Sequence, residues 1–234
     1  MLDVHPPHEA AHTWKDFFVH IATIVIGLLI AVGLEQTVEL FHHRHQVEQI
    51  DEALHNESIE NRDIGRADVD ALRMPIENLR LNREGLRSAA TTDGIISYTW
   101  QETPSPAFWL PLVDSAWLTA RDSAIFSLLP PELVRNRWRV EFTVQQSNTL
   151  GGEYFDTIYA MRSQIHQHGS DIRLTPQERL DALGQLIKLD ARLRNLYSSM
   201  MYFESANDLY LNHEPVTLDN LMKSKAKESK PPSW

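Results

Sequence analysis

The stretch that decides the fold is FFVHIATIVIGLLIAVGL, Phe17 to Leu34, which contains no Asp, Glu, Lys or Arg. At a rise of about 1.5 Å per residue it would form a helix about 27 Å long. The hydrocarbon core of a bilayer is about 30 Å thick. Trp14 and Phe41 suit the two interfaces, where aromatic side chains gather. We therefore expect one transmembrane helix with its interfacial flanks over residues 14–41.

Three other interpretations of this run compete with a span. A cleavable signal peptide needs a basic leader and a small-residue cleavage site, whereas Asp3 and Glu9 precede this run and Glu35 follows it. A buried core helix is usually shorter or carries a polar stripe. An interfacial helix needs a strongly polar face. The span accounts best for the uniform apolar composition.

The charges beside the run do not orient it. The positive-inside rule counts Lys and Arg near each end, and Lys15 on one side balances Arg44 on the other. His42, His43 and His45 would add charge only when protonated.

The core VIGLLIAVGLEQ, Val25 to Gln36, is followed by Phe41 and Arg44 and then by a charged, leucine-bearing segment. This pattern resembles a set of uncharacterised bacterial single-span membrane proteins with a V-I-G-I-L-I-A-like span. The resemblance implies a bacterial inner-membrane protein with a cytoplasmic N-terminus and a periplasmic, helical C-terminal domain. It implies no activity, because none is established for that family.

The composition narrows the possible functions. Asp and Glu outnumber Lys and Arg by 32 to 22 in 234 residues, for a net charge of −10. Nucleic-acid binding normally leaves a basic footprint, so we expect no nucleic-acid partner. The chain has no cysteine, which excludes disulfides and thiolate chemistry.

Beyond the run, apolar residues recur at helical spacing to about Leu86 and predict a long amphipathic helix. Pro75 should kink or restart it, and Gly65 and Gly85 should weaken it locally. Thr91 to Gly94 break the pattern. The β-prone residues 95–100 show no clear partner, so we expect an extended loop there.

Further helices are predicted toward the C-terminus. A short one is expected over Phe108–Arg121. A long one should run from about Glu132 to His168, opened by proline; it carries Leu133, Val134, Arg137, Trp138 and Phe142. Thr175-Pro176-Gln177-Glu178 has the pattern of a capping box. The last long helix should follow it and fade near His213.

The predicted fold class is therefore all-α: a transmembrane helix that continues into a long amphipathic helix, plus an antiparallel helical bundle. The expected domains are a short tail (1–13), the span with its flanks (14–41), a soluble bundle (42–213) and a basic, disordered tail (214–234).

Several histidines are candidate metal ligands. His42 and His45 are three apart, and His8 and His12 are four apart, so each pair could share a helix face. A zinc site usually needs a third ligand and ordered partners around it. The alternative is that these are amphipathic residues at an interface.

Two features lie inside the span. His20 is a polar residue in an apolar run, where it could ligate a haem or a chlorophyll-type pigment, contact another helix, or reach the headgroups. The small residues Gly27, Ala31 and Gly33 could let another helix approach closely. We predict no other cofactor.

No catalytic signature emerges: the aromatic residues after the span suit a core, and the carboxylates suit solvated helix faces. We therefore predict a non-enzymatic accessory or scaffolding subunit of a membrane or envelope complex. Its partners would be the lipid bilayer and other membrane subunits, or a second copy through the span. The alternatives are a ligand-sensing extracytoplasmic domain that relays through a partner, and a cofactor-holding subunit that uses His20.

Overall fold

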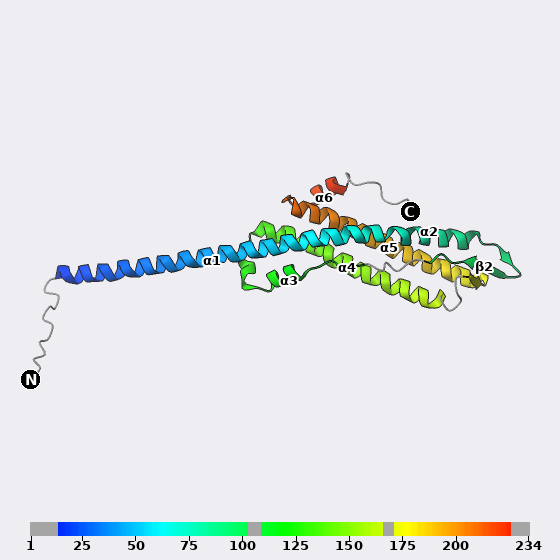
Figure 1. Ribbon diagram of the computed structural model, residues 1–234, viewed down its shortest axis with the longest axis horizontal. Coiled ribbons are helices and arrows are strands. Elements are labelled where there is room, and N and C mark those ends of the chain that lie inside the picture. The colour runs from blue at the N-terminus through cyan, green and yellow to red at the C-terminus, as the bar shows by residue number, and fades with distance from the viewer. Residues whose placement is uncertain (1–13, 103–108, 166–170, 226–234) are drawn as a thin grey trace, which may run out of the picture. The chain divides into compact units, whose positions relative to one another are not determined.

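The computed structural model describes residues 14–102, 109–165 and 171–225. These residues are mostly helical, as the all-α expectation requires, with a few short strands. The elements, shown in Figure 1, are α1 (Trp14–Ala71), α2 (Arg73–Ser88), β1 (Thr91–Thr92), β2 (Ile95–Thr99), α3 (Ser115–Arg121), η1 (Ala124–Leu128), α4 (Pro131–Ile165), β3 (Asp171–Leu174), α5 (Pro176–Leu211) and α6 (Leu218–Lys225).

The chain divides into two compact units, Met1–Gln49 and Ile50–Trp234. In the first unit, α1 is exposed from Trp14 to Phe41. It contains one stretch that is long and apolar enough to cross a membrane, with a mean hydropathy of 2.6 and no buried residue. The Thr23 and Thr37 hydroxyls donate to backbone oxygens one turn earlier, so neither hydroxyl lacks an acceptor.

The second unit is organised around α4 and α5, which lie side by side, with α2 packed against α5 (Figure 1). Buried positions on both helices alternate by three and four residues, the spacing of helices that pack along one seam. The α4 positions that follow this spacing are Arg137, Val140, Val144, Ser147, Gly151, Tyr154, Ile158 and Met161, with Glu141 buried beside them, and the α5 positions include Leu186, Leu189, Leu193, Leu196, Met200 and Phe203.

Local signals set several helix ends. The capping box at Thr175 is confirmed: its hydroxyl accepts from the Glu178 amide at 3.3 Å, and its amide donates to the Glu178 carboxylate at 2.7 Å. Helix α4 begins at Pro131, as predicted. The predicted restart near Pro75 is also confirmed, because α1 ends at Ala71, four residues before that proline. In a continuous helix the Pro75 ring would clash with the Ala71 carbonyl.

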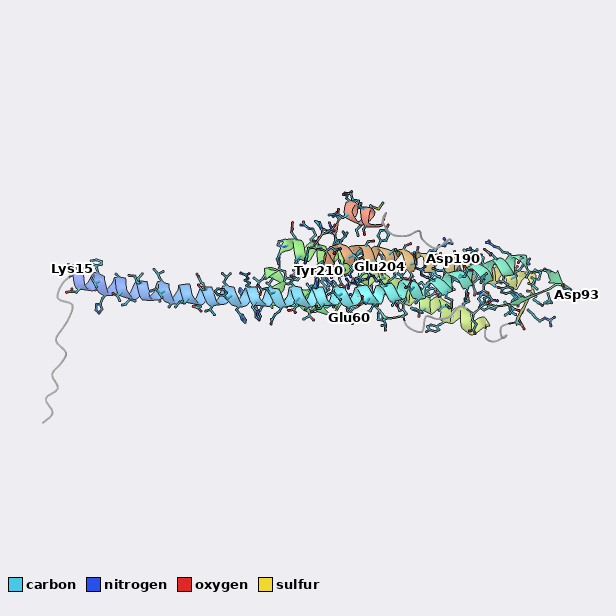
Figure 2. The ribbon with its side chains drawn as sticks, turned by 45° about the horizontal axis from the view of Figure 1, so that its top comes forward. Lys15, Glu60, Asp93, Asp190, Glu204 and Tyr210 are labelled. Carbon is cyan, nitrogen blue, oxygen red and sulfur yellow. The ribbon has the colours of Figure 1, made fainter. Side chains whose placement is uncertain are left out.

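The prediction of an extended loop over residues 95–100 is wrong for residues 95–99. They form β2, which pairs antiparallel with β1 and with β3 in a three-stranded sheet. Asp93 (φ 51°) and Gly94 (φ 76°) make the β1–β2 turn, a conformation with positive φ at both central residues that suits the twist of a hairpin. Figure 2 shows Asp93 at its tip.

The predicted helix over Phe108–Arg121 is shorter than expected, since α3 begins only at Ser115. The residues just before it are not helical because their backbone is paired elsewhere. The Asn148 side chain donates to the Leu112 carbonyl and accepts from its amide, both at 2.8 Å. Asn61 pairs in the same way with Val113, both at 2.6 Å.

Helix α6 follows α5 near the C-terminus, and Val216, just before this helix, is fully buried. The Arg139 guanidinium donates to the Val216 carbonyl, and Asn136 accepts from its amide at 3.2 Å. The chain is therefore held against α4 as far as this point.

Three helical glycines each lie against an aromatic ring. A Cβ would come within 2.9 Å of Phe203 at Gly65, 2.2 Å of Tyr98 at Gly85 and 2.9 Å of Trp109 at Gly151. The sequence interpretation of Gly65 and Gly85 as weak points was incomplete, because their missing side chains make room for core rings.

Gly65→Ala should destabilise the protein by about 1–2 kcal/mol, because Phe203 is fully buried and cannot swing aside. Gly184→Ala is the matched control: a Cβ there meets nothing within 4 Å, so the better helix former should stabilise by up to about 1 kcal/mol. Denaturant unfolding of both variants measures the difference. Equal effects would contradict the packing role of Gly65.

Candidate functional site: a buried arginine–carboxylate cluster

Arg137, at one of the buried seam positions of α4, is fully buried. Its Nη2 donates to Oε1 of Glu57, and its Nη1 donates to the Ser58 hydroxyl and, at 3.4 Å, to the Leu54 carbonyl. All three partners belong to α1. A guanidinium suits this position because its donors form a fixed fork that several acceptors can share.

Glu57 joins the arginine to helix α3. Its Oε1 is bound by Arg137, while its Oε2 accepts from the Ala116 amide at 2.6 Å and from the Ser115 hydroxyl at 3.3 Å. Helix α3 has no cap from its own preceding residue, Asp114. Glu57 therefore does from α1 what an N-cap side chain usually does within a helix, and its negative charge suits the helix N-terminus.

Glu141, one turn after Arg137, is a second carboxylate in the cluster and is 2% exposed. Its Oε2 lies 3.8 Å from Nη2 of Arg137, and Gln145 donates to its Oε1 at 3.2 Å. Burial raises the pKa of Glu141 to about 7, against the attraction of Arg137, and the charges of Asp114 and Glu57 raise it further.

Tyr210 of α5 closes the cluster. The Arg137 guanidinium lies 5.7 Å from its ring centroid, within the range of a cation–π contact. Burial raises the pKa of Tyr210 to about 12. Figure 2 shows Tyr210 far from the hairpin tip at Asp93, so the cluster and the sheet lie in different parts of the second unit.

Asp68 is a buried carboxyl outside this cluster and is 1% exposed. Its Oδ1 accepts a long hydrogen bond, 3.4 Å, from the Leu110 amide. Among the described residues its Oδ2 has no hydrogen-bond partner. Burial raises the pKa of Asp68 to about 7.

The residues that the sequence singled out lie mostly on the first unit and are not brought together. His20, Gly27, Ala31 and Gly33 are exposed on α1, and a Cβ at either glycine would meet nothing within 4 Å.

The other predicted ligands are also dispersed. His45 is exposed, and His42 contacts Gln46 at 3.2 Å. His8 and His12 lie outside the described residues. Within the described part of the chain, no group of three histidine or acidic side chains is placed to hold a metal ion.

Sequence reasoning placed Arg137 on a helix but gave it no role, and it missed Glu57 and Glu141. One signal was present: Arg137 precedes Val140 and Val144 at the three-and-four spacing of buried positions. A charged residue at such a position needs a buried partner. The identity of that partner, Glu57, is not encoded locally.

Comparison of the chain with protein-family models, with curated proteins and with solved structures finds no match. The resemblance carried by Val25 to Gln36 therefore stays a prediction. Fold and site define the chain as a mostly helical protein that joins one exposed apolar helix segment to a unit with a buried arginine–carboxylate cluster.

Arg137→Met should destabilise the protein by about 3–5 kcal/mol, because it leaves Glu57 buried without its counter-charge. Arg135→Met is the matched control: Arg135 is exposed on the same helix and, among the described residues, pairs with exposed Glu132, so about 0–1 kcal/mol is expected. Adding Glu57→Gln to Arg137→Met should recover part of the loss. Additive losses in denaturant unfolding would show that the two residues are not coupled.

Proposed function

We propose that the protein is a non-enzymatic accessory or scaffolding subunit, held in a bacterial inner membrane by a single span within α1. The observation that carries the proposal is the exposure of an apolar helix on every side between Phe17 and Leu34. Each large apolar side chain gains about 1.5–3 kcal/mol when it leaves water. A helix with many such side chains, and with no packing partner for them among the described residues, needs another apolar environment, and lipid supplies it.

The proposed partner contact is the small-residue face of the span. The open space at Gly27 and Gly33 would let another helix backbone approach closely, which is how helices associate where lipid removes the hydrophobic driving force. The partner is then a span of another membrane subunit, or of a second copy. The second unit would project into the periplasm, the side that the family resemblance implies.

The first test is membrane attachment. The full chain should sediment with membranes and resist alkaline extraction, and protease added to spheroplasts should cleave its second unit. Ile26→Arg with Leu29→Arg should release it, since each charge at the centre of a span costs about 2.5–3.5 kcal/mol. Leu180→Arg, at an exposed apolar position of α5, should leave attachment unchanged. Wild-type protein that is soluble in cell extracts would refute the span.

The second test is association. Gly27→Ile with Ala31→Ile should lower the recovery of partners in mild detergent by at least about tenfold, because bulk on this face separates the backbones. Val25→Ile with Leu29→Ile is the control. Each of these residues is two positions from Gly27 along the helix, about 200° around it, so they lie on the opposite face. Recovery of partners should therefore be retained. Recovery of the wild-type chain only as a free monomer would exclude the accessory role.

A further inference from the structure

Helix α3 is attached to the rest of the second unit through groups that share one arginine. Its first turn is capped by Glu57, and Glu57 is held by Arg137. The inner face of α3 is buried: Trp117 is 3% exposed and Ala120 is 1% exposed. Anything that draws Arg137 away from Glu57 therefore weakens the cap of α3.

Glu141 is placed to do this, since its carboxylate, like that of Glu57, lies within ion-pair distance of the Arg137 guanidinium. We propose that Glu141 is a proton-operated latch for α3: the protonated side chain leaves α3 docked on α1, and the ionised one releases it. This device goes beyond the proposed membrane role and is independent of it.

The charges around Glu141 set the direction of the effect. Arg137 attracts the ionised form, while Glu57 and Asp114 repel it, and both of these acids lie at the N-terminus of α3. The charged and polar groups around Glu141 are Arg137, Gln145, Glu57, Asp114 and Arg121. Arg121, on α3, is attracted by both Glu141 and Asp114.

Neutral Glu141 leaves the Arg137 charge to Glu57 alone, so the cap of α3 is intact. Ionised Glu141 competes for the same guanidinium and repels the two acids at the start of α3. Docking of α3 through Glu57 therefore opposes the ionisation of Glu141, because both carboxylates draw on the same guanidinium. Burial raises the pKa of Glu141 to about 7, so the carboxyl ionises and the cap of α3 weakens as the pH rises through about 7.

Amide hydrogen exchange of the full chain in detergent micelles measures the latch. After correction for intrinsic exchange rates, protection of α3 amides should fall severalfold, by up to about tenfold, from about pH 6 to about pH 8, the range in which Glu141 loses its proton. Protection of α5 amides in the core should show no matching loss. Constant α3 protection over this range would overturn the proposal.

Glu141→Gln should keep α3 protected at both pH values, because the amide cannot ionise. Asp68→Asn is the matched control: it removes the other buried carboxyl with a raised pKa, which contacts Leu110 rather than α3, so the loss of α3 protection seen in the wild type should remain. A Glu141→Gln protein that loses α3 protection as the wild type does would refute the latch.

A second variant keeps the proposal testable if Glu141→Gln does not fold. Asp114→Asn removes a charge that raises the pKa of Glu141, so the loss of α3 protection between the two pH values should shrink. An unchanged loss in this variant would count against Glu141 as the group that titrates.

Discussion

The removal of the Arg137 charge from water is the constraint on which the second unit depends. Taking a guanidinium into a protein interior costs several kcal/mol even after relaxation, and only well-placed acceptors offset that cost. Here the acceptors are Glu57, Ser58 and the Leu54 carbonyl, all on α1. A shift of one helix along the other by one residue, about 1.5 Å, would break these bonds together. The arginine therefore fixes the register between α1 and α4 more sharply than apolar packing would.

The same stretch of α1 also orders the chain before α3. Glu57 and Asn61 are four residues apart and so share a helix face. Glu57 holds the Ala116 amide, and Asn61 pairs with both backbone groups of Val113. An asparagine side chain offers one acceptor and a donor, as a peptide group does, so a segment without a strand partner still has its buried backbone groups paired. Asn148 does the same for Leu112 from α4.

What the sequence predicted well depends on neighbouring residues: the cap at Thr175, the start of α4 at Pro131 and the helix break before Pro75. What it missed depends on pairs far apart in the chain. Residues 95–99 are a strand because Asp171–Leu174 returns to pair with them, although Asp93-Gly94 already suited a hairpin turn. The site behaves in the same way, because Glu57 and Arg137 become partners only through the packing of α1 on α4. The residues predicted as sites on the span remain predictions.

Stability alone does not account for the composition of the buried cluster. Glu57 by itself neutralises Arg137, and a buried ion pair can often be replaced by apolar residues without loss. Glu141 adds a second carboxyl whose ionisation the surroundings oppose. An apolar residue at that position would pack without this cost, and Gln would keep the polar contact to Gln145. An ionisable group at position 141 makes the contact of α3 with α1 and α4 depend on the protonation of that group. Neither an apolar residue nor Gln would do this.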